Sequence, residues 1–533
     1  MSNEYSSRSS RRERSKMSRR SKKAFDAVEA AADKATEHLE EENLLQGRIS
    51  RREIARERIV RKETRAQSIP LWVYGLLTAL SALLGLTFYA FPFFHQLATP
   101  TQSQNLYSGL AMQHGLVPFN DFYGTGGSLF YLINWLGNFG GSTLFLWLFQ
   151  IFALLMSGIF IYRLVAQQTK SQNSAVLVSS FSLVIVSGLA RGGNAPTLLS
   201  LPFALWSVLF LSQYFHEDST DKGFIRFGLA GAFSFVIAPV MIVFFAFSAL
   251  ALLIYNVSHR RFWRGFYQML ATIMGIMFVG YSVAYYALEE QTLYTSIEQS
   301  VLIPLTHFGP TGDVLLTVAK ALVLTLVFGI VTGFAQGVIQ LKTAGQASIW
   351  YVLLLIGTVV STSMVVFATT FDSSNLLAVL PFTIVFAGLG IKDSDQVFLK
   401  YLQNRLFAPI LAILFVALAP FAYQYLNKTT FTEEKAVAQY LQAKTRDSDR
   451  VYVLAEDKNI NLLTQKVSTL DRVPAHYPLK FSQNYALNVG NIKDKYVVLE
   501  AGQAVPKNLS DLLAQDYKLV DYTWKQFKIY QRK

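Results

Sequence analysis

The stretch from Leu97 to Phe139 contains one carboxylate, Asp121, and no lysine or arginine. A carboxylate in such a neutral stretch can accept a proton as a general base, or can bind the hydroxyl of an acceptor. The alternative is a structural aspartate between Asn120 and Gly124 that caps a turn by accepting hydrogen bonds from backbone amides. Asp121 is therefore our predicted catalytic residue, with the turn interpretation kept open.

Three further side chains are predicted to bind substrate, two of them close to Asp121 in the sequence. His114, directly before Gly115, is suited to contact a phosphate, although a histidine there is often only the cation at a helix C-terminus. Tyr123 offers an aromatic ring to a sugar. Arg191 stands in a short polar loop and could hold a phosphate, or it could only extend from a helix end toward water.

A second stretch, Glu289 to Asp313, also lacks lysine and arginine. Glu298 and His307 within it are further predicted substrate-binding residues, and any of its acids could supply a carboxylate. Magnesium and manganese favour oxygen ligands, but no spacing of these acids points to a metal, so no metal ligand is assigned and a divalent ion stays an open cofactor. No phosphate-binding loop, dinucleotide fingerprint or His/Cys cluster is present.

The elements that position these residues are apolar. Of 533 residues, 52% are hydrophobic and 16% are charged, and cysteine is absent. A helix of about 20 residues crosses the hydrocarbon layer of a membrane. We therefore expect a polytopic α-helical membrane protein with about eleven spans, at about 71–93, 142–164, 174–190, 196–215, 225–238, 239–257, 266–287, 314–340, 347–370, 376–391 and 406–426.

The net charge of +13 is explained by membrane topology rather than by nucleic acid. With the N-terminus inside, the predicted outward loops hold only Arg191, as the positive-inside rule demands. Eleven spans then place the C-terminus outside. The predicted inward loops hold Lys170, Lys222, Arg226, Arg260, Arg261, Arg264, Lys342, Lys392, Lys400 and Arg405.

Three regions follow from this reading. Residues 1–68 form a cytoplasmic basic tail, partly disordered and partly helical, that is expected to touch anionic lipid. Residues 69–426 form the transmembrane domain, with long outward loops at 94–141 and 288–313. Residues 427–533 form a small outward α/β domain. Short elements are expected within these regions: helices at Asn105–Gln113, Leu129–Phe139, Thr432–Lys444 and Leu509–Gln515, strands at Val451–Ala455 and Tyr496–Glu500, and an edge strand at Gln526–Gln531.

Taken together, these features resemble the GT-C superfamily of membrane glycosyltransferases, in its bacterial branch of protein mannosyltransferases and aminoarabinose transferases. The stretch Gly115–Asp121 is similar to the "G-x-x-P-Y-x-D" segment of that family. Leu376–Gly390 resembles its late span with a central proline, and the outward tail carries its "VYVL" and "YVVL" strands. The resemblance covers about residues 70 to 533.

The resemblance implies transfer of a sugar from a polyprenyl-phosphate donor to an envelope glycan or glycolipid on the outer face of a bacterial plasma membrane. It implies a carboxylate that receives the proton of the acceptor, and cations that hold the phosphate. The sequence departs from the family where an acid usually follows the first span, because Thr99–Asn105 contains none. The basic-Pro-Pro segment of the family is likewise replaced by Thr125–Gly127.

Two other functions stay open. A transporter or flippase of lipid-linked sugars would fit a polytopic chain, but the predicted spans carry almost no ionisable residues and show no inverted repeat. A non-catalytic membrane partner with the transferase fold would fit the missing first-loop acid. Fold resemblance does not decide between these functions.

Overall fold

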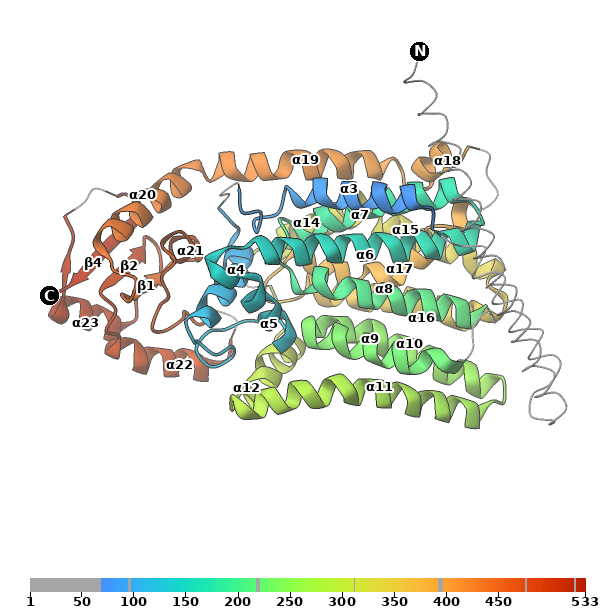
Figure 1. Cartoon of the computed structure of the whole chain (residues 1–533), viewed down its shortest axis with the longest axis horizontal. Helices are drawn as coiled ribbons and strands as arrows, with labels where there is room; N and C mark the ends of the chain where they lie inside the picture. Colours follow the sequence, from blue (N-terminus) through green and yellow to red (C-terminus); the bar gives the residue numbers. More distant parts are fainter. Residues whose placement is uncertain are drawn as a thin grey trace, which may run out of the picture. The chain divides into compact units, whose positions relative to one another are not determined.

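The computed structural model describes residues 69–93, 97–216, 221–310, 312–391, 396–474, 477–521 and 524–533. The predicted lipid-binding tail, residues 1–68, lies outside this described part. Residues 69–533 form one compact unit of a helical bundle capped at one end by a small α/β region (Figure 1). The predicted class, a polytopic helical membrane protein with a C-terminal α/β region, is confirmed.

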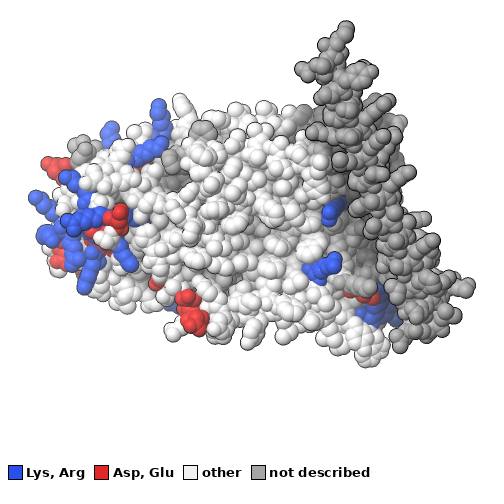
Figure 2. Space-filling model, in the orientation of Figure 1, with Lys and Arg blue, Asp and Glu red and all other residues white. Residues whose placement is uncertain are grey.

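Every predicted span corresponds to an apolar segment of the described chain. Eight segments are individually long and apolar enough to cross a membrane, a ninth is a bent helix pair, and two, α3 and α9, are shorter. This face of the bundle carries almost no charge across a broad belt (Figure 2). The helices are α3 (Leu71–Gly85), α6 (Leu144–Thr169), α7 (Gln172–Ala190), α8 (Pro196–Phe215), α9 (Phe224–Ile237), α10 (Ile242–Ser258), α11 (Phe262–Glu289), α14 (Val314–Val327), α15 (Ile330–Gln340), α16 (Ser348–Val366) and α19 (Ala408–Leu426).

Helices α14 and α15 make the bent pair, with an angle of 62° between them. The break falls at Gly329, whose φ of 74° lies in the left-handed region. The buried guanidinium of Arg405 donates from Nη1 to the Gly329 carbonyl at 2.6 Å. The Gly329 carbonyl also accepts from the Gly333 amide at 2.9 Å, so the arginine adds a second, charged donor to this carbonyl at the start of α15. Arg405 itself follows a short helix, α18 (Val397–Asn404).

The predicted span at 376–391 is irregular and buried. Residues Ser373–Ile391 form short helical turns around α17 (Leu380–Thr383), and 83% of their most apolar window is buried inside the bundle. Irregular backbone at membrane depth is tolerated where protein surrounds it. This segment therefore lies at the centre of the bundle rather than against lipid.

The two long loops contain helices of their own. The first holds α4 (Pro100–Gln113), which Thr99 caps by accepting from the Gln102 amide at 3.4 Å, and α5 (Ser128–Gly137). The second holds α12 (Leu293–Ile297), a π-helical turn η4 (Glu298–Leu302) and α13 (Ile303–Thr306). Both helices expected in the first loop are present, α4 beginning five residues earlier than predicted.

The C-terminal region is a four-stranded sheet with helices. Its elements are α20 (Lys428–Lys444), β1 (Val451–Leu454), α21 (Asn459–Thr464), α22 (Leu479–Asn488), β2 (Tyr496–Glu500), α23 (Lys507–Asp516), β3 (Tyr517–Leu519) and β4 (Phe527–Arg532). The strand order is β1-β2-β4-β3, with β1 and β2 parallel and the other pairs antiparallel.

One strand prediction is wrong. The segment around Gln526–Gln531 was expected at an edge because polar and apolar residues alternate along it. Strand β4 is instead an inner strand, paired with β2 on one side and with β3 on the other. The alternation arises because one face of β4, with Phe527 and Ile529, is buried and the other is exposed. Such alternation does not distinguish an edge strand from an inner strand.

Polar side chains join the C-terminal region to the first loop. Lys458 and Asp471 form a buried ion pair, and Asp471 also accepts from Gln104 Nε2 at 2.9 Å. The Ser468 amide donates to the Tyr107 hydroxyl at 3.1 Å. Residues from α4 therefore satisfy polar groups of the C-terminal region, and these bonds hold α4 against that region.

Candidate functional site

The candidate site begins where α7 ends. Arg191 is the residue after α7 and adopts a left-handed φ of 45°, so the chain turns sharply into Gly192 and Gly193. The Tyr89 amide donates to the Gly192 carbonyl at 2.8 Å. A Cβ on Gly192 would lie 2.2 Å from the Tyr89 ring. Glycine is therefore required here for the tyrosine to lie against the turn that carries Arg191.

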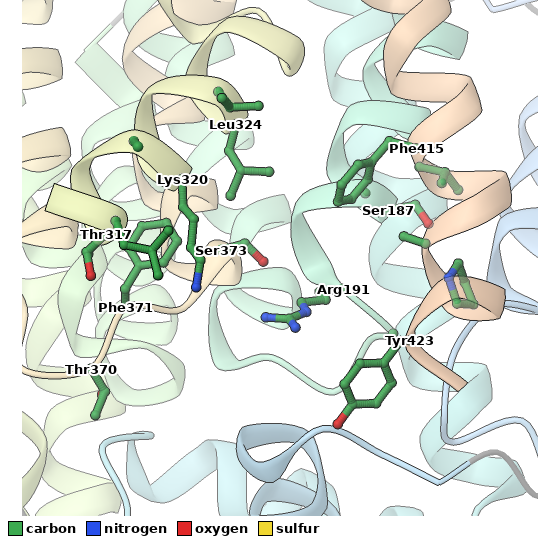
Figure 3. Close-up of a pocket in the computed structure, with 18 of the residues that line it drawn as sticks. Ser187, Arg191, Thr317, Lys320, Leu324, Thr370, Phe371, Ser373, Phe415 and Tyr423 are labelled. Carbon is green, nitrogen blue, oxygen red and sulfur yellow. The ribbon is translucent and has the colours of Figure 1, made fainter. Parts of the chain in front are cut away.

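Arg191 points into a cavity of about 800 Å³ between the ends of α7, α14 and α19 (Figure 3). Lys320, on α14, points into the same cavity. The Tyr423 ring, on α19, lies under the guanidinium with 6.0 Å from Cζ to the ring centroid, a cation–π distance. Hydroxyl groups of Ser187, Thr317, Ser373 and Tyr423 share the lining with apolar side chains.

The two cations of this cavity have no acidic partner among the described residues. Neither Arg191 nor Lys320 forms an ion pair with a described carboxylate, whereas Lys458, Lys480 and Lys495 each do. A charge near apolar helices is costly when it is unpaired. The cavity is therefore built to receive an anion. The hydroxyls of Ser187 and Tyr423 can donate to it, whereas those of Thr317 and Ser373 already donate to backbone carbonyls.

Two carboxyls lie near this cavity, in the C-terminal region. Glu434, on α20, is buried, and Asp457 follows β1; their side chains are hydrogen-bonded to each other. Burial, and then the neighbouring carboxyl, raises the pKa of Glu434 well above its ordinary value, and burial also raises the pKa of Asp457. Both carboxyls act electrostatically on Tyr423, which lines the cavity. The arrangement favours a proton on Glu434 that is donated to Asp457.

Asp121 lies in a turn and accepts a hydrogen bond from a backbone amide, as the structural alternative to a catalytic role predicts. Its Oδ2 accepts from the Val117 amide at 2.8 Å and its own amide donates to the Val117 carbonyl at 2.9 Å. It does not line the Arg191 cavity. His114 is exposed at the end of α4, where its Nδ1 is 3.1 Å from the Leu110 carbonyl.

The other predicted residues are distributed over the contact with the C-terminal region. The Tyr123 ring packs against Tyr477 and Phe481, with centroids 5.6 and 5.9 Å away. Glu298 is buried and ion-paired with Lys480 of α22. His307 is exposed beside a small cavity of about 130 Å³ that also meets Thr125. Of the six predicted residues, Arg191 lines the large cavity and the other five do not.

Sequence reasoning missed Lys320 and the Glu434–Asp457 pair. Lys320 had a usable signal, because an ionisable residue inside an apolar span is a functional candidate by default. The carboxyl pair had none, since its members stand on different elements and meet through the packing of α20 against α21. Among the described residues, no group of three or more His, Cys, Asp or Glu is arranged to hold a metal ion.

Two solved structures of ArnT share this fold. ArnT from Cupriavidus metallidurans bound to undecaprenyl phosphate aligns with a TM-score of 0.61 and 11% identity, over 86% of this chain and 97% of that one. The same protein in the apo state aligns at 0.59 and 12% identity, over 86% and 97%. The oligosaccharyltransferase AglB from Archaeoglobus fulgidus aligns at 0.44 and 12%, over 87% and 74%. None of the curated proteins matches the chain.

Family models cover nearly the whole sequence. The model described as "Putative competence-induced protein Ccs4 N-terminal domain" matches residues 62–428, which is more than half of the chain. The model for the C-terminal domain of the same protein matches residues 431–533. The two matches meet at the junction of α19 and α20, where the bundle gives way to the α/β region. The chain therefore belongs to the family described as "Putative competence-induced protein Ccs4".

Proposed function

We propose that this protein is a membrane glycosyltransferase that takes a sugar from a polyprenyl-phosphate donor. The observation that carries the proposal is the cavity in which Arg191 and Lys320 point at a common space without a carboxylate partner among the described residues. Phosphate oxygens would neutralise both charges, and guanidinium and ammonium groups form strong, charge-assisted hydrogen bonds with them.

The cavity also suits the lipid part of such a donor. Leu316, Val323 and Leu324 of α14 face Phe415 and Val416 of α19 across it. Only 11% of the most apolar window of α19 is buried within the protein, so the apolar surface of this helix is available to a polyprenyl chain. The shared fold with ArnT, which is described with undecaprenyl phosphate bound, supports a ligand of this class.

The transfer needs two kinds of group. As the acceptor oxygen bonds to the anomeric carbon of the sugar, the bond from that carbon to the phosphate oxygen breaks, and Arg191 and Lys320 stabilise the negative charge that the leaving phosphate gains. The proton of the acceptor hydroxyl passes to a carboxylate. Asp457 is our proposed proton acceptor: burial raises the pKa of Glu434 so that Glu434 keeps its proton and donates a hydrogen bond to Asp457, and the Asp457 carboxylate then accepts the proton of the hydroxyl. Asp121 stays a prediction, and its carboxylate already serves a turn.

We place the site on the outer face of a bacterial plasma membrane. The distribution of cations predicts an N-terminus inside. Arg191 shares its cavity with Tyr423, which lies near the end of α19 that leads into α20 and the C-terminal region. The acceptor would then be a glycan or glycolipid of the cell envelope. A protein that binds the lipid carrier without transfer is the second candidate, favoured by the missing acid after the first span.

Binding of undecaprenyl phosphate to the full-length protein in lipid nanodiscs tests the proposal. Arg191→Gln and Lys320→Gln should each weaken binding roughly tenfold or more, because one charged hydrogen bond contributes about 1.5–3 kcal/mol. Lys342→Gln, in the turn after α15 and outside the cavity, is the matched control and should bind as wild type does. Undecaprenol, which has no phosphate, should bind all four proteins equally. Equal binding of the phosphate by wild type and both cavity variants would overturn the proposal.

A further inference from the structure

A second large cavity lies between the first loop and the C-terminal region. It has a volume of about 680 Å³, within the range of roughly 300–1,000 Å³ that ligand pockets occupy. Its walls come from the ends of α3 and α6, from α4, and from α20 and α21. We refer to it as the amide groove, because five amide side chains line it: Asn138, Gln439, Gln442, Asn459 and Gln465.

Three amides of this groove are held so that their carbonyl oxygens stay available, whereas the Asn459 oxygen accepts from the Ala98 amide at 3.1 Å. Gln442 Nε2 donates to the Leu463 carbonyl at 2.7 Å, and Gln465 Nε2 donates to the Leu462 carbonyl at 2.7 Å. Asn138 Nδ2 donates to the Asn134 carbonyl at 2.9 Å. In each of these three amides one N–H is therefore occupied, while the side-chain oxygen retains lone pairs that can accept from a hydroxyl.

The charge of the groove differs from that of the cavity lined by Arg191 and Lys320, which we call the phosphate cavity. Lys435 is the one charged side chain in its lining, and apolar surface from Phe91, Leu106 and Leu462 separates the amides. Amides bond to hydroxyls, and apolar surfaces suit the C–H faces of sugar rings. A neutral ligand with many hydroxyls fits this lining better than a phosphate, which would need more cations.

The amide groove and the phosphate cavity meet at one side chain. Tyr89 lines both of them. Asn459, in the groove, donates from Nδ2 to Glu434 Oε2 at 3.2 Å, so the groove also reaches the carboxyl pair that contains the proposed proton acceptor. We infer that the amide groove binds the acceptor, a neutral chain of sugars whose attacking hydroxyl lies at the Tyr89 end. This inference rests on the proposed transferase function.

Two exposed positions on α20 allow opposite tests of the groove. Gln439→Ala together with Gln442→Ala removes two amides, and Gln439→Trp fills the space. The probe is the neutral oligosaccharide fraction released by mild acid from the envelope of cells that make the protein, measured by native mass spectrometry on the full-length protein in nanodiscs. Wild type should bind this fraction, and both variants should bind it at least fivefold more weakly. Arg191→Gln should bind it as wild type does.

The controls separate failure of the inference from failure of the proposed function. Both α20 variants should retain undecaprenyl phosphate binding. If either variant binds the oligosaccharide fraction as tightly as wild type does, the inference is overturned and the donor site is unaffected. Preference for the acidic oligosaccharide fraction would overturn it as well. Single sugars that compete as well as oligosaccharides would assign the groove to the sugar of the donor and overturn the acceptor assignment. If the wild-type protein does not bind undecaprenyl phosphate, the proposed function is refuted instead.

Discussion

Two regions of this protein use lysine in opposite ways. At the contact between α4 and the C-terminal region, Lys458 is buried with 5% of its side chain exposed and is paired with Asp471, 2% exposed. In the cavity at the end of α7, Lys320 and Arg191 have no such partner among the described residues. Both regions lie at the same end of the bundle, so the membrane surface does not account for the difference.

The difference separates charges that build the fold from charges that await a ligand. Lys458 is satisfied by Asp471 and lies over the Tyr107 ring at 5.1 Å, so its site is complete without any further group. The cavity cations are complete only when an anion enters. An unpaired cation near apolar helices is therefore stronger evidence for a binding site than a paired one, because no carboxylate of the fold offsets the cost of its charge.

The largest expected effect comes from breaking the paired lysine. Lys458→Met leaves Asp471 buried without its cation, which should lower the free energy of unfolding by about 3–5 kcal/mol. Lys320→Met removes an uncompensated charge, so we expect its stability to be unchanged or higher. Thermal unfolding of the two full-length variants in the same detergent measures the difference.

A double variant checks the reason for this effect. Lys458→Met with Asp471→Leu removes both charges and should recover part of the loss, because no buried charge is left unpaired. If Lys320→Met destabilises the protein as strongly as Lys458→Met, the cavity lysine supports the fold and the contrast between the two regions fails.

A smaller effect is expected from the shared proton of Glu434 and Asp457. The raised pKa of both means that the folded protein binds protons that the unfolded chain releases. Stability is then fully present below the ordinary carboxyl values, about 4, and is lost as the pH rises through the raised values. Glu434→Gln should flatten this decline, by about 1.4 kcal/mol for every unit of pKa difference removed.

Unfolding midpoints across a pH series from the ordinary carboxyl range to neutrality measure this flattening. Asp511→Asn, at an exposed position on α23, is the control and should follow wild type. A wild-type midpoint that rises toward neutral pH would show that the pair is ionised in the folded protein, so that Glu434 would hold no proton to donate to Asp457.

Much of the fold could be predicted from sequence, because apolar run length reports membrane helices directly. Eight of the eleven predicted spans match segments long and apolar enough to cross a membrane, and a ninth matches the bent pair, whereas α3 and α9 are shorter. The strand Tyr496–Glu500 has its predicted ends. The breaks and the burial of Ser373–Ile391 were not foreseen, since run length does not distinguish a helix facing lipid from an irregular segment inside the bundle.

The site was harder to predict because it depends on which helix ends meet. Arg191 was singled out from charge distribution alone, and the structure places it in the cavity. Its meeting with Lys320, far along the chain, follows from the packing of α14 and α19 near α7. Asp121 was favoured because it is the one acid in its loop, yet local turn chemistry occupies its carboxylate.

The smallest expected effect concerns Asp121. Asparagine keeps an oxygen that can accept from the Val117 amide, so Asp121→Asn should cost less than about 1 kcal/mol of stability, and Asp121→Ala about 1–2 kcal/mol. The envelope glycan should keep its added sugar in cells carrying Asp121→Asn at equal protein level, and should lose it with Asp457→Asn or with a deletion. If Asp121→Asn loses the sugar and Asp457→Asn keeps it, the carboxylate of the first loop is the proton acceptor after all. The carboxyl pair of the C-terminal region would then belong, with Lys458 and Asp471, to the charges that build the fold.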